Sequence, residues 1–299
     1  MSSWLFFALS GPLLWAFTNV FDGALRRNFI RDDLSLTWLT AICRLPFVAL
    51  FFLISGLSFP NAPVFFGMII AGMLWTSPMF FYYKALKEDD PSRIALLLQL
   101  VPIFTLPIAF FVIGERLVGF QVLAFVSLIF AGIFASLKKM YGKWKLSRAL
   151  FLMALSCFVW AISDVLFKKF APFFPDYMSA FSVDFLGGFL ICFFLFLMPK
   201  NKKKVLESLK GLSLKAWLIV FSSVSFGIAG GLSYNYALTL GKASLTSVLM
   251  GTQPLFVLII GLFFAHVSGF LKEDMRKSSL ILKATSFVFL VIGLILLQI

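Results

Sequence analysis

Long apolar runs separated by short polar connections dominate this chain. Cutting the runs at charges, proline and glycine predicts ten helices, at residues 3–24, 35–55, 63–84, 92–113, 117–136, 148–170, 177–198, 214–239, 244–267 and 279–298. Most runs reach the roughly 20 residues that a helix needs to cross about 30 Å of hydrocarbon. The pattern therefore predicts an all-α integral membrane protein with ten transmembrane helices.

Part of the sequence pattern occurs twice along the chain. The stretch "YYKALKEDDPSRIALLLQLVPIF" begins at Tyr82, and "YNYALTLGKASLTSVLMGTQPLF" begins 152 positions later, at Tyr234, so that Pro102 falls on Pro254. These stretches join the third and fourth predicted spans, and the eighth and ninth. The chain therefore contains an internal repeat of span pairs.

The first span repeats as well. "WAFTNV", from Trp15, lies over "WAISDV", from Trp160, at an offset of 145, and pairs Asn19 with Asp164. We predict two five-helix halves, residues 1–142 and 143–299. Because five is odd, the halves enter the membrane from opposite sides and form an inverted repeat, an arrangement typical of alternating-access transporters. Alternatively, the duplication only builds a helical bundle.

Composition agrees with a membrane protein: 61% of residues are hydrophobic, 13% are charged, and the net charge is +13. The lipid bilayer is thus one partner. The basic residues are scattered between apolar runs, which gives no nucleic-acid surface. The odd-numbered connections carry 21 Lys and Arg and the even-numbered ones 4. By the positive-inside rule, both termini then lie outside.

The order of spans, repeat and motifs resembles the drug/metabolite transporter superfamily, specifically its ten-helix EamA type. The resemblance rests on five features: Arg44 in the second span, Ala85, Leu86, Pro102, and the Gly114-Glu115 pair that closes the fourth span. It implies secondary transport of small metabolites, often export, through a cavity lined by the first, third and fourth spans of each half. It also implies a prokaryotic plasma (inner) membrane and termini inside, opposite to the charge count.

Arg44 is the most deeply placed charge. An ionised side chain in mid-membrane is costly and usually faces a partner or a wet cavity. Arg44 either holds a carboxylate or phosphate of the substrate, or pairs with a buried carboxylate such as Asp184 to fix helix packing. Lys84 is a second candidate cation.

Polar and aromatic residues share faces of the first and sixth spans. Trp15, Asn19 and Asp22 recur at i, i+4 and i+7, and Trp160 and Asp164 follow the same spacing. We predict that these faces line a cavity. Asp164, Asp184 and Asp22 are the candidates for proton coupling, because a buried carboxylate without a partner favours its protonated form. The alternative is ordinary ion pairing of Asp22 and Asp164 with Arg26 and Lys168 at i+4.

The third and eighth spans add aromatic rings at matching places. Trp75 and Tyr82 belong to one, Tyr234 and Asn235 to the other, and such rings can hold a cation over their faces. Tyr82 and Tyr83 alternatively belong to an interfacial belt.

Gln99 and Gln253 stand near Pro102 and Pro254, each of which leaves a carbonyl one turn earlier without a helical donor. Helices broken at equivalent places in two halves point to a binding site. A proline kink satisfied by neighbouring groups is the alternative.

We predict a substrate-binding set of Trp15, Asn19, Arg44, Trp75, Tyr82, Gln99, Trp160, Asp164, Tyr234, Asn235 and Gln253. The expected function is secondary, alternating-access transport of a small polar or amphipathic metabolite such as an amino acid or amine, as an exporter and with proton coupling. The alternatives are carriage of an anionic metabolite, such as a nucleotide sugar or sugar phosphate, and a membrane enzyme or lipid-handling protein.

No Walker A, HExxH or GxSxG motif occurs, so the sequence gives no basis for ATP-driven pumping or catalysis. Cys43, Cys157 and Cys192 lie in apolar segments without metal-ligand spacing and are expected to pack as small hydrophobes. We expect no cofactor and no metal, a small-molecule substrate, and a monomer.

Overall fold

The structure is a computed structural model that describes residues 3–55, 59–89, 91–115, 119–140, 143–268 and 277–296. Its first part contains α1 (Ser3–Asn28), α2 (Asp33–Ile42), α3 (Leu45–Ser55), α4 (Ala62–Thr76), α5 (Met79–Glu88), α6 (Pro91–Leu97), α7 (Leu100–Ile113) and α8 (Gly119–Ser136). An antiparallel hairpin of β1 (Leu137–Met140) and β2 (Lys143–Leu146) follows.

The second part contains α9 (Arg148–Phe170), α10 (Tyr177–Leu197), α11 (Pro199–Leu209), α12 (Leu214–Leu240), α13 (Ala243–Leu249), α14 (Gln253–Ser268) and α15 (Lys277–Leu296). Two 3₁₀ turns, η1 (Ala171–Phe173) and η2 (Met250–Thr252), complete the described elements. The all-helical character of the predicted spans is thus confirmed. The connections carry more structure than predicted, because the Lys-rich segment after α10 is a helix.

Among the described residues, seven segments are long and apolar enough to cross a membrane, with mean hydropathy from 1.4 to 2.4. They are Trp4–Asn28, Asp33–Ser55, Ala62–Glu88, Arg93–Ile113, Arg148–Phe173, Tyr177–Leu197 and Leu214–Leu240. These match seven of the ten predicted spans, and the protein is an integral membrane protein. At the other three places the structure has helices α8, α14 and α15.

The second and third spans lie where they were predicted, but each contains a break that the sequence analysis did not predict. The second breaks at Cys43 and Arg44, between α2 and α3, and the third breaks at Ser77 and Pro78, between α4 and α5. Prolines explain both interruptions, because the ring nitrogen cannot donate to the carbonyl one turn earlier. Pro46 does this in the second span. Arg44 therefore lies at a helix break.

The fourth and ninth spans are broken where their prolines predict. Leu98 and Gln99 separate α6 from α7 ahead of Pro102, and η2 separates α13 from α14 ahead of Pro254. Leu98 and Met250, 152 positions apart, thus occupy equivalent breaks in the two halves.

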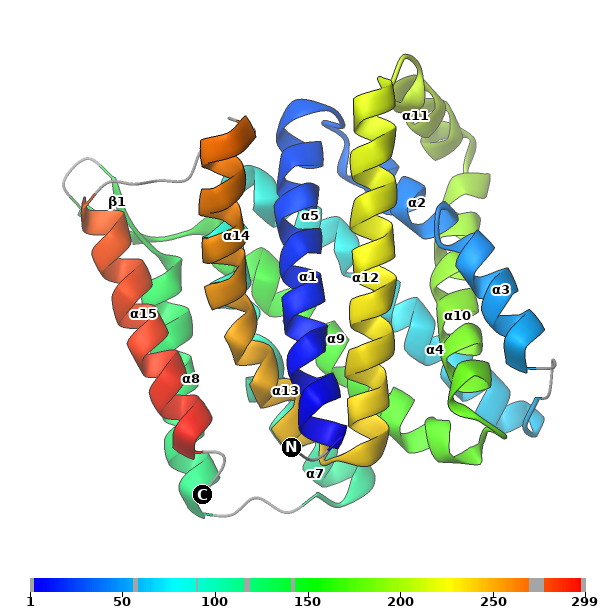
Figure 1. Cartoon of the computed structure of the whole chain (residues 1–299), viewed down its shortest axis with the longest axis horizontal. Coiled ribbons are helices and arrows are strands. Elements are labelled where there is room, and N and C mark those ends of the chain that lie inside the picture. Colours follow the sequence, from blue (N-terminus) through cyan, green and yellow to red (C-terminus); the bar gives the residue numbers. More distant parts are fainter. Residues whose placement is uncertain are drawn as a thin grey trace.

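Helices of the two halves pack reciprocally. α1 lies along α12 at the centre of the bundle, and α9 packs against α4 and α5 (Figure 1). Since α9 repeats α1 and α12 repeats the third span, each first helix packs on the third span of the other half. α8 and α15 pair at one edge. Both termini lie at one end of the bundle, opposite α11 and the β1–β2 hairpin.

Glycines bring α4 and α10 into backbone contact. A Cβ on Gly72 would meet the Asp184 carbonyl oxygen at 1.6 Å, and one on Gly187 would meet the Ile69 carbonyl oxygen at 2.1 Å. Small residues at such crossings let transmembrane helices approach closely. This crossing ties the third span to the seventh behind the central helices.

Candidate substrate cavity

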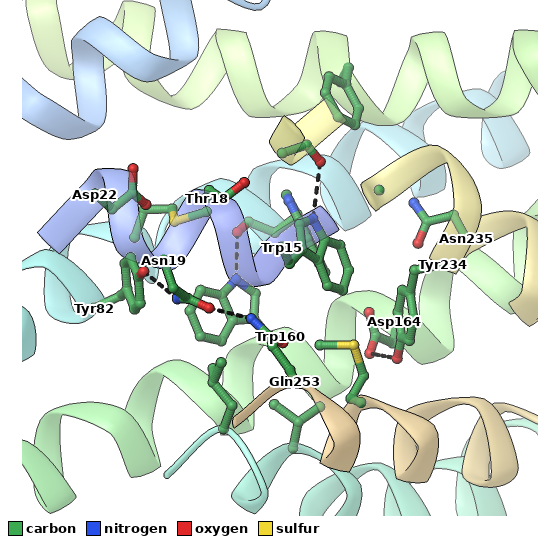
Figure 2. A pocket seen from close by; sticks show the side chains of 18 of the residues that line it. Trp15, Thr18, Asn19, Asp22, Tyr82, Trp160, Asp164, Tyr234, Asn235 and Gln253 are labelled. Carbon is green, nitrogen blue, oxygen red and sulfur yellow. Dashed lines mark hydrogen bonds between the residues drawn. The ribbon is translucent and has the colours of Figure 1, made fainter. Parts of the chain in front are cut away.

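A cavity lies between the central helices of both halves. Its lining residues come from both halves: Trp15, Thr18, Asn19, Asp22, Arg44, Trp75, Met79, Tyr82, Leu98, Val101, Trp160, Asp164, Phe185, Gly227, Gly231, Tyr234, Asn235, Met250 and Gln253. Figure 2 shows the side chains of α1 meeting those of α9, α12 and α14 around this space.

Ten of the eleven residues predicted to bind substrate line this cavity, and Asp22 does so as well. Gln99 and Asp184 are buried outside the lining, with 0% and 3% of their surface exposed. Lys84, the second candidate cation, is exposed. Binding by any of these residues stays a prediction.

Aromatic rings from five helices form a continuous wall. Trp15 lies 5.0 Å from Tyr234 and 5.5 Å from Trp75, measured between ring centroids. Trp160 continues the row, 6.3 Å from Trp75 and 5.9 Å from Tyr82. Tyr82, at 3% exposure, is not a residue of an interfacial belt.

Hydrogen bonds hold this wall through two matched indole contacts. The Trp15 indole N–H donates to the Gly227 carbonyl over 3.0 Å, and the Trp160 indole N–H donates to the Trp75 carbonyl over 2.8 Å. Trp160 repeats Trp15 at the 145 offset, and Gly227 repeats Trp75 at the 152 offset. The two bonds are therefore counterparts in the two halves.

Hydroxyl groups one turn further along repeat the relation. Thr18 donates to the Ser223 carbonyl over 3.3 Å, and Ser163 donates to the Ala71 carbonyl over 2.8 Å. The same two offsets relate these partners. Each first helix is thus hydrogen-bonded to the third span of the other half at equivalent residues.

Asn19 and Asp164 also occupy equivalent positions, each against a tyrosine. The Asn19 amide donates to the Tyr82 hydroxyl over 2.5 Å within one half. In the other half, the Tyr234 hydroxyl donates to Asp164 Oδ2 over 2.7 Å. The second carboxylate oxygen of Asp164 has no hydrogen-bond partner, although the residue is only 2% exposed.

A chain of hydrogen bonds crosses the cavity from Gln253. Its amide donates to Asn19 Oδ1, and Asn19 donates in turn to Tyr82 (Figure 2). Asp22, on the same helix as Asn19, accepts a hydrogen bond from the Ser223 hydroxyl over 2.6 Å. Gln253 Oε1, at the open end of the chain, is buried and has no partner.

Arg44 places its guanidinium carbon 5.6 Å from the centroid of the Phe185 ring. In the described part of the chain it forms no salt bridge with Asp184, the structural partner that the sequence offered. Asp184 Oδ1 is likewise a buried acceptor without a hydrogen bond. Arg44 is therefore a cation at the cavity wall.

Gln99 reaches the ninth span and not the cavity. Its side-chain amide donates to the Met250 carbonyl over 3.5 Å. Pro254, four residues later, cannot donate to this carbonyl, which also accepts from the backbone N–H of Gln253 at the end of η2. Gln99 thus donates a hydrogen bond to the backbone at the helix break between α13 and α14 in the other half.

Comparison with known proteins decides the family. The model of the EamA-like transporter family matches this chain twice, over residues 2–138 and 147–298. The chain belongs to the EamA-like transporter family. It is an EamA-family membrane transporter, as the resemblance implied, and no curated protein matches its sequence. A solved structure described only as "Crystal structure of protein" shares the fold, with a TM-score of 0.69 and 19% identity, over 100% of this chain and 96% of that chain.

The Gly114-Glu115 pair of this EamA-like transporter closes α7 and joins three spans. Gly114 takes the left-handed conformation, with φ of 70°, which suits glycine after a helix. Glu115 accepts a hydrogen bond from the backbone N–H of Ala243 over 3.0 Å and pairs with Lys168 over 3.1 Å. The pair therefore links the fourth, sixth and ninth spans.

The ion pairs at i+4 that the sequence offered are not formed. Arg26 pairs with Asp33 over 2.5 Å, and Lys168 pairs with Glu115. Asp22 and Asp164 instead accept hydrogen bonds from Ser223 and Tyr234. They belong to the cavity and not to helix-surface ion pairs.

Sequence reasoning missed eight lining residues of this transporter: Thr18, Met79, Leu98, Val101, Phe185, Gly227, Gly231 and Met250. The repeat contained a signal for some of them, because Leu98 and Met250 are paired by the 152 offset and precede the prolines. Among the described residues, no cluster of three or more His, Cys, Asp or Glu is placed to hold a metal ion.

Proposed function

We propose that this EamA-like transporter carries a small amphipathic metabolite with an amine group by alternating access. The row of aromatic rings, with Asp164 and Asp22 in the same lining, is the observation that carries the proposal. Aromatic faces and carboxylates both attract a cation, and the effect grows where water is excluded. In an amino acid, the carboxylate would be held by Arg44.

The proposed inverted repeat, with halves 1–142 and 143–299, is supported by the matched hydrogen bonds of the two halves. The indole, hydroxyl and tyrosine contacts recur at equivalent residues, and α1 begins at the end of the bundle opposite the hairpin that precedes α9 (Figure 1). Two such halves can pack in two nearly equivalent ways around one site, which is the basis of alternating access. The family resemblance makes export the proposed direction.

An anionic solute is less well supported. In the described lining, Arg44 is the only cation, and Lys84 is exposed outside it. Binding of a sugar phosphate calls for several cationic or N–H donors. The carboxylates of Asp22 and Asp164 would oppose an anion.

Proton coupling would use Asp164. Its neighbouring titratable groups are Tyr234 on α12 and Asp184 on α10, while Lys168 on its own helix pairs with Glu115. Amine uptake into vesicles with an imposed pH gradient measures the coupling. We expect the gradient to accelerate transport by the wild type and to have no effect on Asp164→Asn.

Counterflow of labelled phenethylamine in vesicles that contain the purified full chain tests the proposed function. We expect movement of the unchanged amine, at least tenfold slower in Trp160→Ala. Trp38→Ala is the matched control, because Trp38 stacks on Phe196 outside the cavity, at 4.8 Å between centroids. Absence of movement, chemical conversion of the amine, or equal loss in both variants would refute the proposal.

A further inference from the structure

The lining of the cavity contains two buried polar atoms without hydrogen bonds, and both are acceptors. Asp164 Oδ1 and Gln253 Oε1 have no partner, and their residues are each 2% exposed. A buried acceptor left unpaired is unfavourable, because it has lost its hydrogen bonds to water. Both atoms therefore favour a ligand that brings hydrogen-bond donors.

The orientation of the Gln253 amide follows from the chain of bonds that it starts. The Asn19 amide nitrogen donates to the Tyr82 hydroxyl, which leaves Asn19 Oδ1 as the acceptor for the Gln253 amide nitrogen. The oxygen of Gln253 is the atom that remains unpaired.

The repeat explains why Asp164 lacks a second partner. Asn19, its counterpart, receives the amide of Gln253 on its oxygen. The residue equivalent to Gln253, 152 positions earlier, is Val101, which lines the cavity but has no donor. The side-chain oxygen of Asn19 in the first half therefore has a hydrogen-bond donor, whereas Oδ1 of the equivalent Asp164 in the second half has none.

We propose that the cavity selects amines that carry N–H donors, meaning protonated primary and secondary amines, over quaternary ammonium ions. This inference rests on the proposed function and names the substrate class. Asp164 Oδ1 and Gln253 Oε1 accept the N–H groups, and the rings of Trp15 and Trp160 contact the apolar part of the solute. A quaternary ammonium satisfies the aromatic faces equally but leaves both acceptors unpaired.

Binding of one scaffold in four methylation states tests the inference. Phenethylamine and its N-methyl, N,N-dimethyl and N,N,N-trimethyl derivatives are titrated against the purified chain at pH 7, where all four are cations. We expect affinity to fall along the series, by at least tenfold from the primary amine to the quaternary ion. Equal or tighter binding of the quaternary ion overturns the inference and leaves the proposed function intact. Binding of none of the four overturns both.

Val101→Gln supplies the missing donor and so makes the second half resemble the first. We expect it to bind phenethylamine at least tenfold more weakly than the wild type and to lose the dependence on methylation. Val101→Leu, an apolar control at the same position, retains the wild-type order. A wild-type order in a folded Val101→Gln protein counts against the role of Asp164.

Discussion

Single side chains in this molecule donate hydrogen bonds to carbonyl groups at helix breaks inside the membrane. Proline frees a carbonyl that has no water to bond, and an unpaired buried polar group costs several kcal/mol in such surroundings. Pro254 removes the donor that a continuous helix would offer to the Met250 carbonyl, and this carbonyl accepts instead from the Gln99 side chain and the Gln253 backbone N–H. The side chain of one half thereby completes the backbone of the other.

Gln99→Leu should lower the melting temperature of the detergent-solubilised protein slightly, by about 0.5–1 kcal/mol of stability, because the Met250 carbonyl loses one of its two donors and keeps the Gln253 backbone N–H. Pro254→Ala restores a backbone N–H one turn after that carbonyl. We therefore expect the double variant to be more stable than Gln99→Leu alone. Strictly additive losses in this double-mutant cycle would show that the two groups do not serve the same carbonyl.

At the scale of the helices, glycine determines how closely two of them can pack. α4 and α10 touch through Gly72 and Gly187, whose missing Cβ atoms leave room for the carbonyl oxygens of the facing helix. Without a hydrophobic driving force between helices in lipid, such close packing is a main source of association. This crossing supports the α4 and α10 residues of the cavity, Trp75 and Phe185.

Gly72→Ala is expected to be strongly destabilising, because the new Cβ would lie 1.6 Å from a backbone oxygen that cannot move alone. Gly227→Ala is the matched control in another transmembrane helix, since its Cβ would meet only the Thr18 side chain at 3.6 Å. Thermal unfolding and yield of monodisperse protein measure the difference. Equal melting temperatures for the two variants contradict the proposed contact.

At the scale of the whole molecule, ion pairs join the two halves at both ends of the bundle. Lys168 and Glu115 do so at the end that holds the termini, and Lys204 of α11 pairs with Asp32 at the opposite end, over 2.5 Å. Burial tends to raise the Asp32 pKa, but hydrogen bonds from Lys204 and Ser35 outweigh this and leave the pKa below its ordinary value of 3.8.

Because the folded-state pKa of Asp32 is depressed, its carboxylate stabilises the protein above the unfolded-state pKa of about 3.9. This contribution is lost as the pH falls through the lower, folded-state pKa. Lys204→Gln should therefore lower stability at pH 7, by about 0.5 kcal/mol for so exposed a pair. The difference from the wild type should shrink as the pH falls below 3.8 and through the folded-state pKa of Asp32.

Melting curves from pH 7 down a series of acidic pH values check this. Lys203→Gln is the control, because Lys203 pairs with the exposed Glu207 on its own helix. A Lys204→Gln difference that stays constant over the whole series would assign the effect to packing and not to the Asp32 charge.

The lengths of the apolar runs predicted most of the spans. The repeat and the helical faces identified the proposed binding residues, ten of which line one cavity. Breaks at Arg44 and Pro78 were missed, because a proline in an apolar run either kinks or interrupts a helix, and packing decides which. The partners of Lys168 and Arg26 were also missed. The i+4 spacing suggests partners on the same helix, whereas Glu115 belongs to another helix and Asp33 lies beyond the end of α1.

The difference between Asn19 and Asp164 has a consequence for energetics. Under the proposed alternating access, two identical halves would give the inward-open and outward-open forms equal free energy. An amide on one side of the pseudo-symmetry axis and a carboxylate on the other remove that degeneracy. The empty carrier should therefore rest mainly in one orientation, and the charge on Asp164 sets how unequal the two populations are.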